Sequence, residues 1–107
     1  MDIRLLSCGE DMFVLVTYDV NTQTPEGRRR LRQVAKICTN YGVRAQKSVF
    51  ECVVDGLQFM EMKTKVANVI DFECDSVRYY NMGKGGRAHV EHVGANPPFD
   101  VENVLIV

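Results

Sequence analysis

The sequence has no long apolar run, only two histidines and no closely spaced pair of cysteines. No stretch approaches the ~18 apolar residues that a membrane-spanning helix needs, and the first eleven residues lack the pattern of a secretory signal. We therefore expect a cytoplasmic protein with no membrane partner. With 107 residues, of which 46% are hydrophobic and 25% charged, the chain suits one globular domain with a core of its own.

Metal-binding and disulfide patterns are also missing. The two histidines are His89 and His92, whose side chains would point to opposite faces of a strand, so they do not predict a zinc site. The cysteines lack the dense spacing of a disulfide scaffold, so we expect reduced thiols that lie mostly in the core. They are Cys8, Cys38, Cys52 and Cys74.

The common catalytic fingerprints are absent as well. The chain has no nucleotide-binding glycine pattern, no G-x-S-x-G elbow and no Cys/His pair in a recognisable context. The segment GKGGR at 83–87 lacks the following helix of a phosphate loop, and we interpret it as a turn. Nucleophilic catalysis by a side chain is not indicated.

Periodicity predicts strands and helices in alternation. Residues 12–20 are β-branched and aromatic, as in a central strand. Thr24 and Pro25 then predict the start of a helix whose apolar positions continue to Tyr41, with Gly42 placed to stop it. Residues 42–55 predict either two short strands joined near 46–48 or one bent strand. A second helix, capped by Asp55, would continue to about Phe72. Strands follow at 76–82 and 89–93, and 103–107 would add another.

This order predicts an α+β fold of the ferredoxin-like βαββαβ type with an extra C-terminal strand, in which an antiparallel sheet carries both helices on one face. We assign residues 12–107 to this domain and 1–11 to a dispensable extension. The other face of the sheet would still expose apolar side chains, either Phe13 and Leu15 or Val14 and Val16. Because such a face needs a cover, we expect a homodimer.

Two features indicate a function. Asp19 ends the first strand, where a carboxylate either caps a turn or holds a hard cation, and its position alone favours the turn cap. The second feature is a basic segment without any acid, which is either a solvated surface or a footprint for nucleic acid. We favour binding to phosphate, because ordinary surfaces mix both signs of charge. Its residues are Arg28, Arg29, Arg30, Arg32, Lys36, Arg44 and Lys47.

Four segments together resemble a known family, the small nuclease subunit of the CRISPR adaptation module, and most closely its type I-C branch. They are MFVLVTYDV at 12–20, RRRLRQVAKICTNYG at 28–42, VRAQKSVFECVVD at 43–55 and SVRYYNMG at 76–83. The resemblance covers residues 12–107. It implies a ferredoxin-like homodimer, with C-terminal strands crossing between subunits, that works with the CRISPR integrase in spacer acquisition and antiviral defence.

The resemblance also implies an endonuclease that depends on Mg2+, with Mn2+ as a substitute. Asp19 and its symmetry mate would hold the cation, Ser48 would bind phosphate or water, and the ring of Phe50 would shape the site as a third catalytic residue. Tyr18 would be structural. The basic residues would grip the backbone of DNA or RNA without regard to sequence. Two alternatives stay open: a non-catalytic DNA-binding adaptor that bridges integrase subunits, and a toxin-type ribonuclease on the same fold. The sequence does not decide between DNA and RNA.

Overall fold

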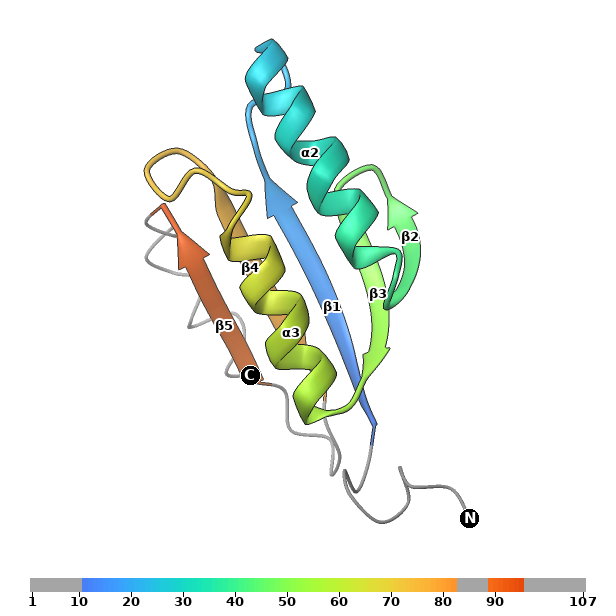
Figure 1. The fold of residues 1–107 in the computed structure, drawn as a ribbon. Helices are drawn as coiled ribbons and strands as arrows, with labels where there is room; N and C mark the ends of the chain where they lie inside the picture. The colour runs from blue at the N-terminus through green and yellow to red at the C-terminus, as the bar shows by residue number, and fades with distance from the viewer. Residues whose placement is uncertain (1–10, 83–88, 96–107) are drawn as a thin grey trace.

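The computed structural model describes residues 11–82 and 89–95, and the predictions for residues 1–10, for the 83–87 turn and for a strand at 103–107 lie outside this part of the chain. Within it, five strands and two helices follow one another along the chain (Figure 1). They are β1 (Met12–Asp19), α2 (Pro25–Cys38), β2 (Gly42–Gln46), β3 (Val49–Val54), α3 (Gly56–Ala67), β4 (Ser76–Asn81) and β5 (His89–Gly94).

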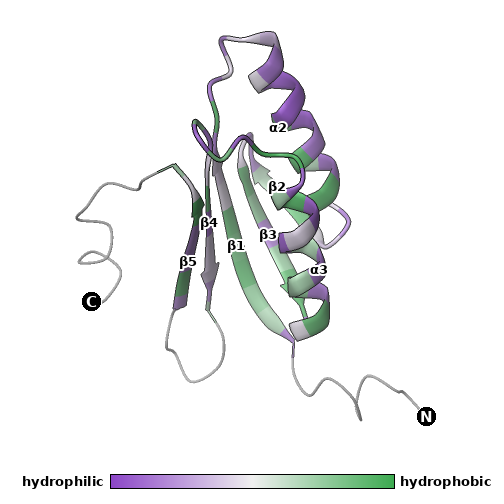
Figure 2. Ribbon diagram, turned by 60° about the vertical axis from the view of Figure 1, so that its left-hand side comes forward, coloured by the Kyte–Doolittle hydropathy of each residue, from purple (hydrophilic) through white to green (hydrophobic). Residues whose placement is uncertain are grey.

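The strands form one sheet in the order β2-β3-β1-β4-β5, and every neighbouring pair is antiparallel. Both helices lie on the same face of this sheet, and no described element covers the other face (Figure 2). The predicted ferredoxin-like fold is therefore confirmed, including the hairpin between β2 and β3. The extra strand is β5, which pairs with β4 of its own chain, and the crossing of a C-terminal segment to a partner stays a prediction.

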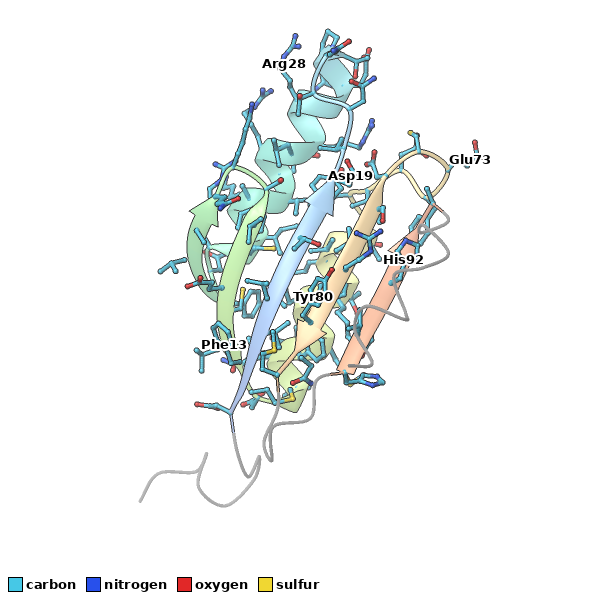
Figure 3. The ribbon with its side chains drawn as sticks, turned by 180° about the vertical axis from the view of Figure 1, so that it is seen from behind. Phe13, Asp19, Arg28, Glu73, Tyr80 and His92 are labelled. Atoms are coloured by element: carbon cyan, nitrogen blue, oxygen red, sulfur yellow. The ribbon has the colours of Figure 1, made fainter. Side chains whose placement is uncertain are left out.

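Alternation along β1 decides which side chains face the helices. Val14, Val16 and Tyr18 are buried beneath the helices, and the pattern leaves Phe13, Leu15, Thr17 and Asp19 on the uncovered face. Figure 3 looks onto this open face, with Phe13 toward one end of β1 and Asp19 at the other. The structure thus selects the register in which Phe13 and Leu15 are the uncovered residues.

The core lies between the sheet and the two helices. The rings of Phe59 and Tyr79 meet edge to face with their centroids 5.7 Å apart. Cys38 and Cys52 are buried there, and burial raises the pKa of these thiols to about 12 and about 11. Cys74 is exposed in the loop before β4, so two of the three described cysteines lie in the core, in line with the expectation that most of them would.

Both helices begin as the sequence predicts. The Thr24 hydroxyl accepts a hydrogen bond from the Gly27 amide at 3.0 Å, and Asp55 and Gln58 form a reciprocal capping box. Gly27 allows the preceding loop to pack against the first turn, since a Cβ there would lie 1.8 Å from the Asn21 carbonyl oxygen. No helix in 11–82 and 89–95 has the length and apolarity needed to span a membrane.

Both helices end earlier than the sequence predicts. The first stops at Cys38 rather than near Tyr41, because the Tyr41 carbonyl accepts a hydrogen bond from the Val53 amide at 3.2 Å and so belongs to the sheet. Gly42 does not cap the helix but begins β2, where a Cβ would lie 2.0 Å from the Glu51 carbonyl oxygen. The second helix stops at Ala67. The chain then turns, and the Asp71 amide donates a hydrogen bond to the side chain of Asp75, the residue before β4.

Candidate active site

Asp19 is the last residue of β1 and lies exposed on the open face. The loop that follows is capped by other residues: the Asn21 side chain accepts from the Gln23 amide at 2.9 Å, and Thr24 caps α2. Among residues 11–82 and 89–95, no donor is hydrogen-bonded to the Asp19 carboxylate. The turn-cap interpretation therefore has no contact to support it, and the carboxylate faces outward as an oxygen ligand would.

Polar side chains continue from Asp19 across β4 and β5. Ser76 pairs directly with Asp19 and therefore shares its face of the sheet. The Ser76 hydroxyl and Nε2 of His92 are 2.9 Å apart. Burial lowers the pKa of His92 and the nearby Arg78 charge lowers it further, while a hydrogen bond with the Ala95 backbone opposes them. Figure 3 shows His92 on β5, toward the same end of the sheet as Asp19.

A charged cluster lies directly behind this site, on the helix side of the sheet. The Asp75 side chain is fully buried and accepts hydrogen bonds from Arg30 Nε at 2.7 Å, from Arg30 Nη2 at 3.2 Å and from the Asp71 amide at 3.0 Å. The Tyr18 hydroxyl donates to the same carboxylate. Burial and this carboxylate raise the pKa of Tyr18, and the hydrogen bonds to Asp75 raise that of Arg30. We refer to Tyr18, Arg30 and Asp75 as the buried cluster.

The buried cluster fixes the strand ends that carry the site. Tyr18 precedes Asp19 and Asp75 precedes Ser76, so Asp19 and Ser76 are each adjacent in sequence to a residue of the cluster. The backbone carbonyl of Asp75 also accepts from the Ala95 amide at 2.7 Å, which ties down the end of β5. This placement agrees with the structural role expected of Tyr18. Sequence reasoning missed Asp75, because its side-chain partners Tyr18 and Arg30 are 57 and 45 positions away in the chain.

Six of the seven predicted basic residues are exposed. Arg28 and Arg29 lie near the start of α2, whose N-terminal end projects past the end of β1 (Figure 1). Arg30 is different, because its guanidinium is engaged by Asp75 and its side chain is only 19% exposed. Its assignment to nucleic-acid binding is corrected to a structural role. The exposed six are Arg28, Arg29, Arg32, Lys36, Arg44 and Lys47.

A further basic residue, Arg78, was missed because it stands alone in a strand. It lies on the open face, where the register pairs it with Thr17 on one side and His92 on the other. Its Nε is buried without a hydrogen-bond partner among the described residues. The open face therefore carries a positive charge one row from the Asp19 carboxylate.

The two other predicted site residues are Ser48 and Phe50, and only Ser48 lies where a substrate could reach it. Ser48 lies in the turn before β3, and its carbonyl accepts from the Tyr18 amide at 2.9 Å, which puts it at the Asp19 end of the sheet. Phe50 is 0% exposed and belongs to the core beneath the helices. Because solvent does not reach this ring, we assign Phe50 no contact with substrate, and its part is to support β3 from the helix side.

The oxygen chemistry of the site suits a hard cation, although one chain supplies only part of a coordination shell. The described residues contain no group of three or more His, Cys, Asp or Glu side chains that could hold a metal. Asp19 is exposed at the rim of an uncovered sheet face, so a second copy of the chain and a substrate phosphate can reach it. One carboxylate of this chain could therefore serve as a ligand of a hard cation only if the remaining ligands came from outside the chain.

The fold thus places exposed cationic side chains on α2 and an exposed carboxylate at the end of β1. Residues 12–90 match the family described as CRISPR associated protein Cas2. The chain belongs to this family, as the resemblance predicted.

Named relatives agree with this assignment. The chain is 54% identical over 96 residues, 90% of its length and 100% of the relative's, to the CRISPR-associated endoribonuclease Cas2 of Chlorobaculum tepidum. It is 50% identical over 95 residues, 89% of its length and 99% of the relative's, to the CRISPR-associated endonuclease Cas2 of Halalkalibacterium halodurans. The crystal structure of Streptococcus pyogenes Cas2 at pH 6.5 has 55% identity and a TM-score of 0.66, covering 69% of this chain and 89% of that one. The prediction of a nuclease is confirmed at this level, while the type I-C branch stays a prediction.

Proposed function

We propose that the protein is an endonuclease of the CRISPR adaptation machinery that hydrolyses phosphodiester bonds of DNA or RNA with the help of Mg2+, or of Mn2+ in its place. The observation that carries this proposal is the exposed Asp19 carboxylate, which no described donor engages. The names of the relatives include both an endoribonuclease and an endonuclease, so both nucleic acids are candidate substrates. Such an activity would serve spacer acquisition and antiviral defence in the cytoplasm, beside the integrase.

A homodimer would complete the site. The open face is apolar away from Asp19, with Phe13 42% exposed, Val43 61% and Val53 58%. Packing two such faces together would remove these side chains from water, which stabilises association by roughly 25 cal/mol per Å2 of apolar area. A two-fold axis near the end of β1 would bring the two Asp19 carboxylates face to face. Each subunit would then provide half of the ligands.

In this dimer the residues of the chain divide the work. The two Asp19 carboxylates hold the cation, which when bound supplies charge stabilisation and a water of lowered pKa. The exposed arginines and lysines, headed by Arg29 and Arg32 on α2, bind backbone phosphates without reading bases. Ser48 would approach the phosphate from the turn before β3. The substrate is thereby positioned by charge, which predicts cleavage without sequence preference.

A second candidate function is a non-catalytic adaptor that holds DNA for the integrase. This function is favoured by the small number of metal ligands, since the described residues of one chain contain no cluster of side chains that could hold a metal. The adaptor would use the same basic residues but would not need Asp19. A toxin-type ribonuclease on this fold would need Asp19 but no integrase.

The test is cleavage of duplex DNA, single-stranded DNA and RNA with Mg2+, Mn2+ or a chelator by wild type and Asp19→Asn. Cleavage should fall by at least ~10²-fold in Asp19→Asn, the low end of losses when an electrostatic stabiliser of a transition state is removed. Asp11→Asn, which changes an exposed carboxylate at the other end of β1, is the matched control and should keep full activity. Full cation-dependent cleavage by Asp19→Asn would overturn the proposal and favour the adaptor.

A further inference from the structure

A single arginine on the open face points to the place where a nucleic acid would lie, and this inference rests on the proposed function. We infer that Arg78 binds a backbone phosphate of the nucleic acid beside Asp19, with the hydroxyl of Thr17 as a further donor to the same phosphate.

The sheet register places Arg78 in the polar part of the open face. Arg78 lies on β4, directly opposite Thr17 on β1 and His92 on β5. The adjacent row contains Asp19 opposite Ser76. Arg78 and Asp19 are therefore diagonal neighbours, ~7–8 Å apart at their Cα atoms, a separation that a long side chain can bridge. A phosphate bound by this guanidinium would lie next to the Asp19 carboxylate.

The Arg78 guanidinium has no acceptor within the described part of the chain. Its Nε is buried and has no hydrogen-bond partner there. The ion pairs found in residues 11–82 and 89–95 do not include Arg78. A buried donor without a partner destabilises a protein, and native structures rarely leave one unpaired. An acceptor would therefore come from a molecule that binds to the open face.

The chemistry of this position suits a phosphate. A guanidinium presents its donors in one plane and binds phosphate through two parallel hydrogen bonds. The Cβ atom of Thr17 lies ~4.5–5.5 Å from that of Arg78, so the Thr17 hydroxyl can donate to another oxygen of the same phosphate. A nucleic acid carries further phosphates along its backbone, which the exposed basic residues would bind. Arg78 would add the contact that holds one phosphate at Asp19.

A carboxylate of a partner subunit is the competing acceptor. The open face carries two acids, Asp19 and Glu51, which a face-to-face dimer would bring toward Arg78. Pairing with Asp19 would withdraw the carboxylate on which the proposed function depends. Glu51 lies between Leu15 and Val43, on the far side of β1 from Arg78. The observations therefore favour the phosphate, and the two acceptors predict different effects on the dimer.

The experiment measures binding of short single-stranded DNA and RNA by fluorescence anisotropy in EDTA, so that no cleavage contributes. Arg78→Gln should weaken binding of both by at least ~10-fold, the effect of losing hydrogen bonds to a charged group. The slope of log K against log salt concentration should fall by ~0.7, the value for one phosphate of a single strand. Arg78→Lys keeps the charge without the planar donors, so it should retain the slope and bind with intermediate affinity.

Lys65→Gln is the matched control, because it removes one exposed positive charge from α3 on the helix side of the sheet. This variant should bind both oligonucleotides as tightly as wild type. Equal losses in Lys65→Gln and Arg78→Gln would show that only the net charge matters, and would overturn the inference.

Nuclear magnetic resonance locates the contact. The Nε–H signal of Arg78, identified by its absence from Arg78→Lys, should shift when the DNA oligonucleotide is added. Inorganic phosphate at the same phosphate concentration should shift this signal less, because a backbone phosphate is also held by its neighbours in the strand. A shift with inorganic phosphate but none with the oligonucleotide would indicate an adventitious ion only, and would overturn the inference.

The remaining outcomes separate this inference from the proposed function. Wild-type affinity in Arg78→Gln would overturn the inference. Dissociation of the Arg78→Gln dimer in analytical ultracentrifugation, with an Nε–H signal that the oligonucleotide leaves unchanged, would assign Arg78 to a carboxylate of the partner subunit and also overturn it. Either result leaves the proposed function intact if Asp19→Asn loses cleavage. Weak binding by Arg78→Gln together with full cleavage by Asp19→Asn would refute the proposed function and keep Arg78 as a phosphate contact.

Discussion

Asp75→Asn probes the buried cluster that holds the site in place. The substitution keeps the size of the side chain but removes a carboxylate that is 0% exposed and that engages Arg30 through two nitrogens. Arg30 would be left as an unpaired charge under the helix, and the Asn amide would face donors from Tyr18 and Asp71. Breaking a buried ion pair by removing one partner costs about 3–5 kcal/mol.

The structure places the expected loss at the lower end of this range. The Arg30 side chain keeps 19% exposure and can move toward water, so we expect a loss of about 3 kcal/mol in the free energy of unfolding. With a urea dependence of about 1–3 kcal/mol per molar, the unfolding midpoint should fall by roughly 1–3 M. Tyr18→Phe removes one hydrogen bond and leaves the ion pair, so it should cost only about 1 kcal/mol.

Urea unfolding followed by circular dichroism measures both changes. Glu73→Gln is the matched control, because it neutralises an exposed acid in the same loop and should be nearly silent. A loss below about 0.5 kcal/mol in Asp75→Asn, the ordinary range for surface substitutions, would show that the cluster does not stabilise the fold and would refute this reasoning. Asp75→Asn should also weaken Mn2+ binding, since the strand end that carries Asp19 loses its support.

Further predictions concern the surfaces and the titration of His92. Leu15→Glu places a charge on the open face opposite Glu51 and should convert a homodimer to monomers in analytical ultracentrifugation; a wild-type monomer at micromolar concentration would contradict the dimer. Replacing Arg29 and Arg32 together should weaken binding to unrelated oligonucleotides by similar factors. It should also reduce the slope of log K against log salt concentration by ~0.9 for each phosphate that the protein no longer neutralises. If the variant binds as tightly as wild type, the nucleic acid lies on another surface. The pKa of His92 is lower in the folded protein than its ordinary value of 6.5, so its contribution to stability is present above pH 6.5 and is lost as pH falls through the folded pKa. His92→Gln should therefore reduce the change in the unfolding midpoint between about pH 7 and pH 5. The same pH profile in wild type and variant would argue against this contribution. Deleting residues 1–11 should leave stability nearly unchanged, and loss of the fold would show that the extension is part of the domain.

Local patterns sufficed for the order of the elements. The alternation in 12–20 predicted β1, and cap residues such as Thr24 and Asp55 located both helix starts. Alternation alone left two faces equivalent for β1. Only the packing of Val14 and Val16 under the helices decided that Asp19 stands on the open side.

Contacts between distant residues could not be predicted in the same way. Arg30 is one of several similar arginines, and nothing near it in the sequence marks it as the partner of Asp75, 45 positions away. The early end of α2 has the same origin, because the Tyr41 carbonyl pairs with β3. Phe50 was assigned to the site from a family motif, whereas the structure buries it on the helix side of the sheet, opposite the face that carries Glu51.

The central claim is that two chains share one cation through their Asp19 carboxylates. Calorimetric titration of the dimer with Mn2+ at known protein concentration tests it most directly, because the stoichiometry reports the number of chains per site. We predict one cation for every two chains and loss of this binding in Asp19→Asn. One cation per chain, or one per two chains that persists in Asp19→Asn, would contradict the shared site.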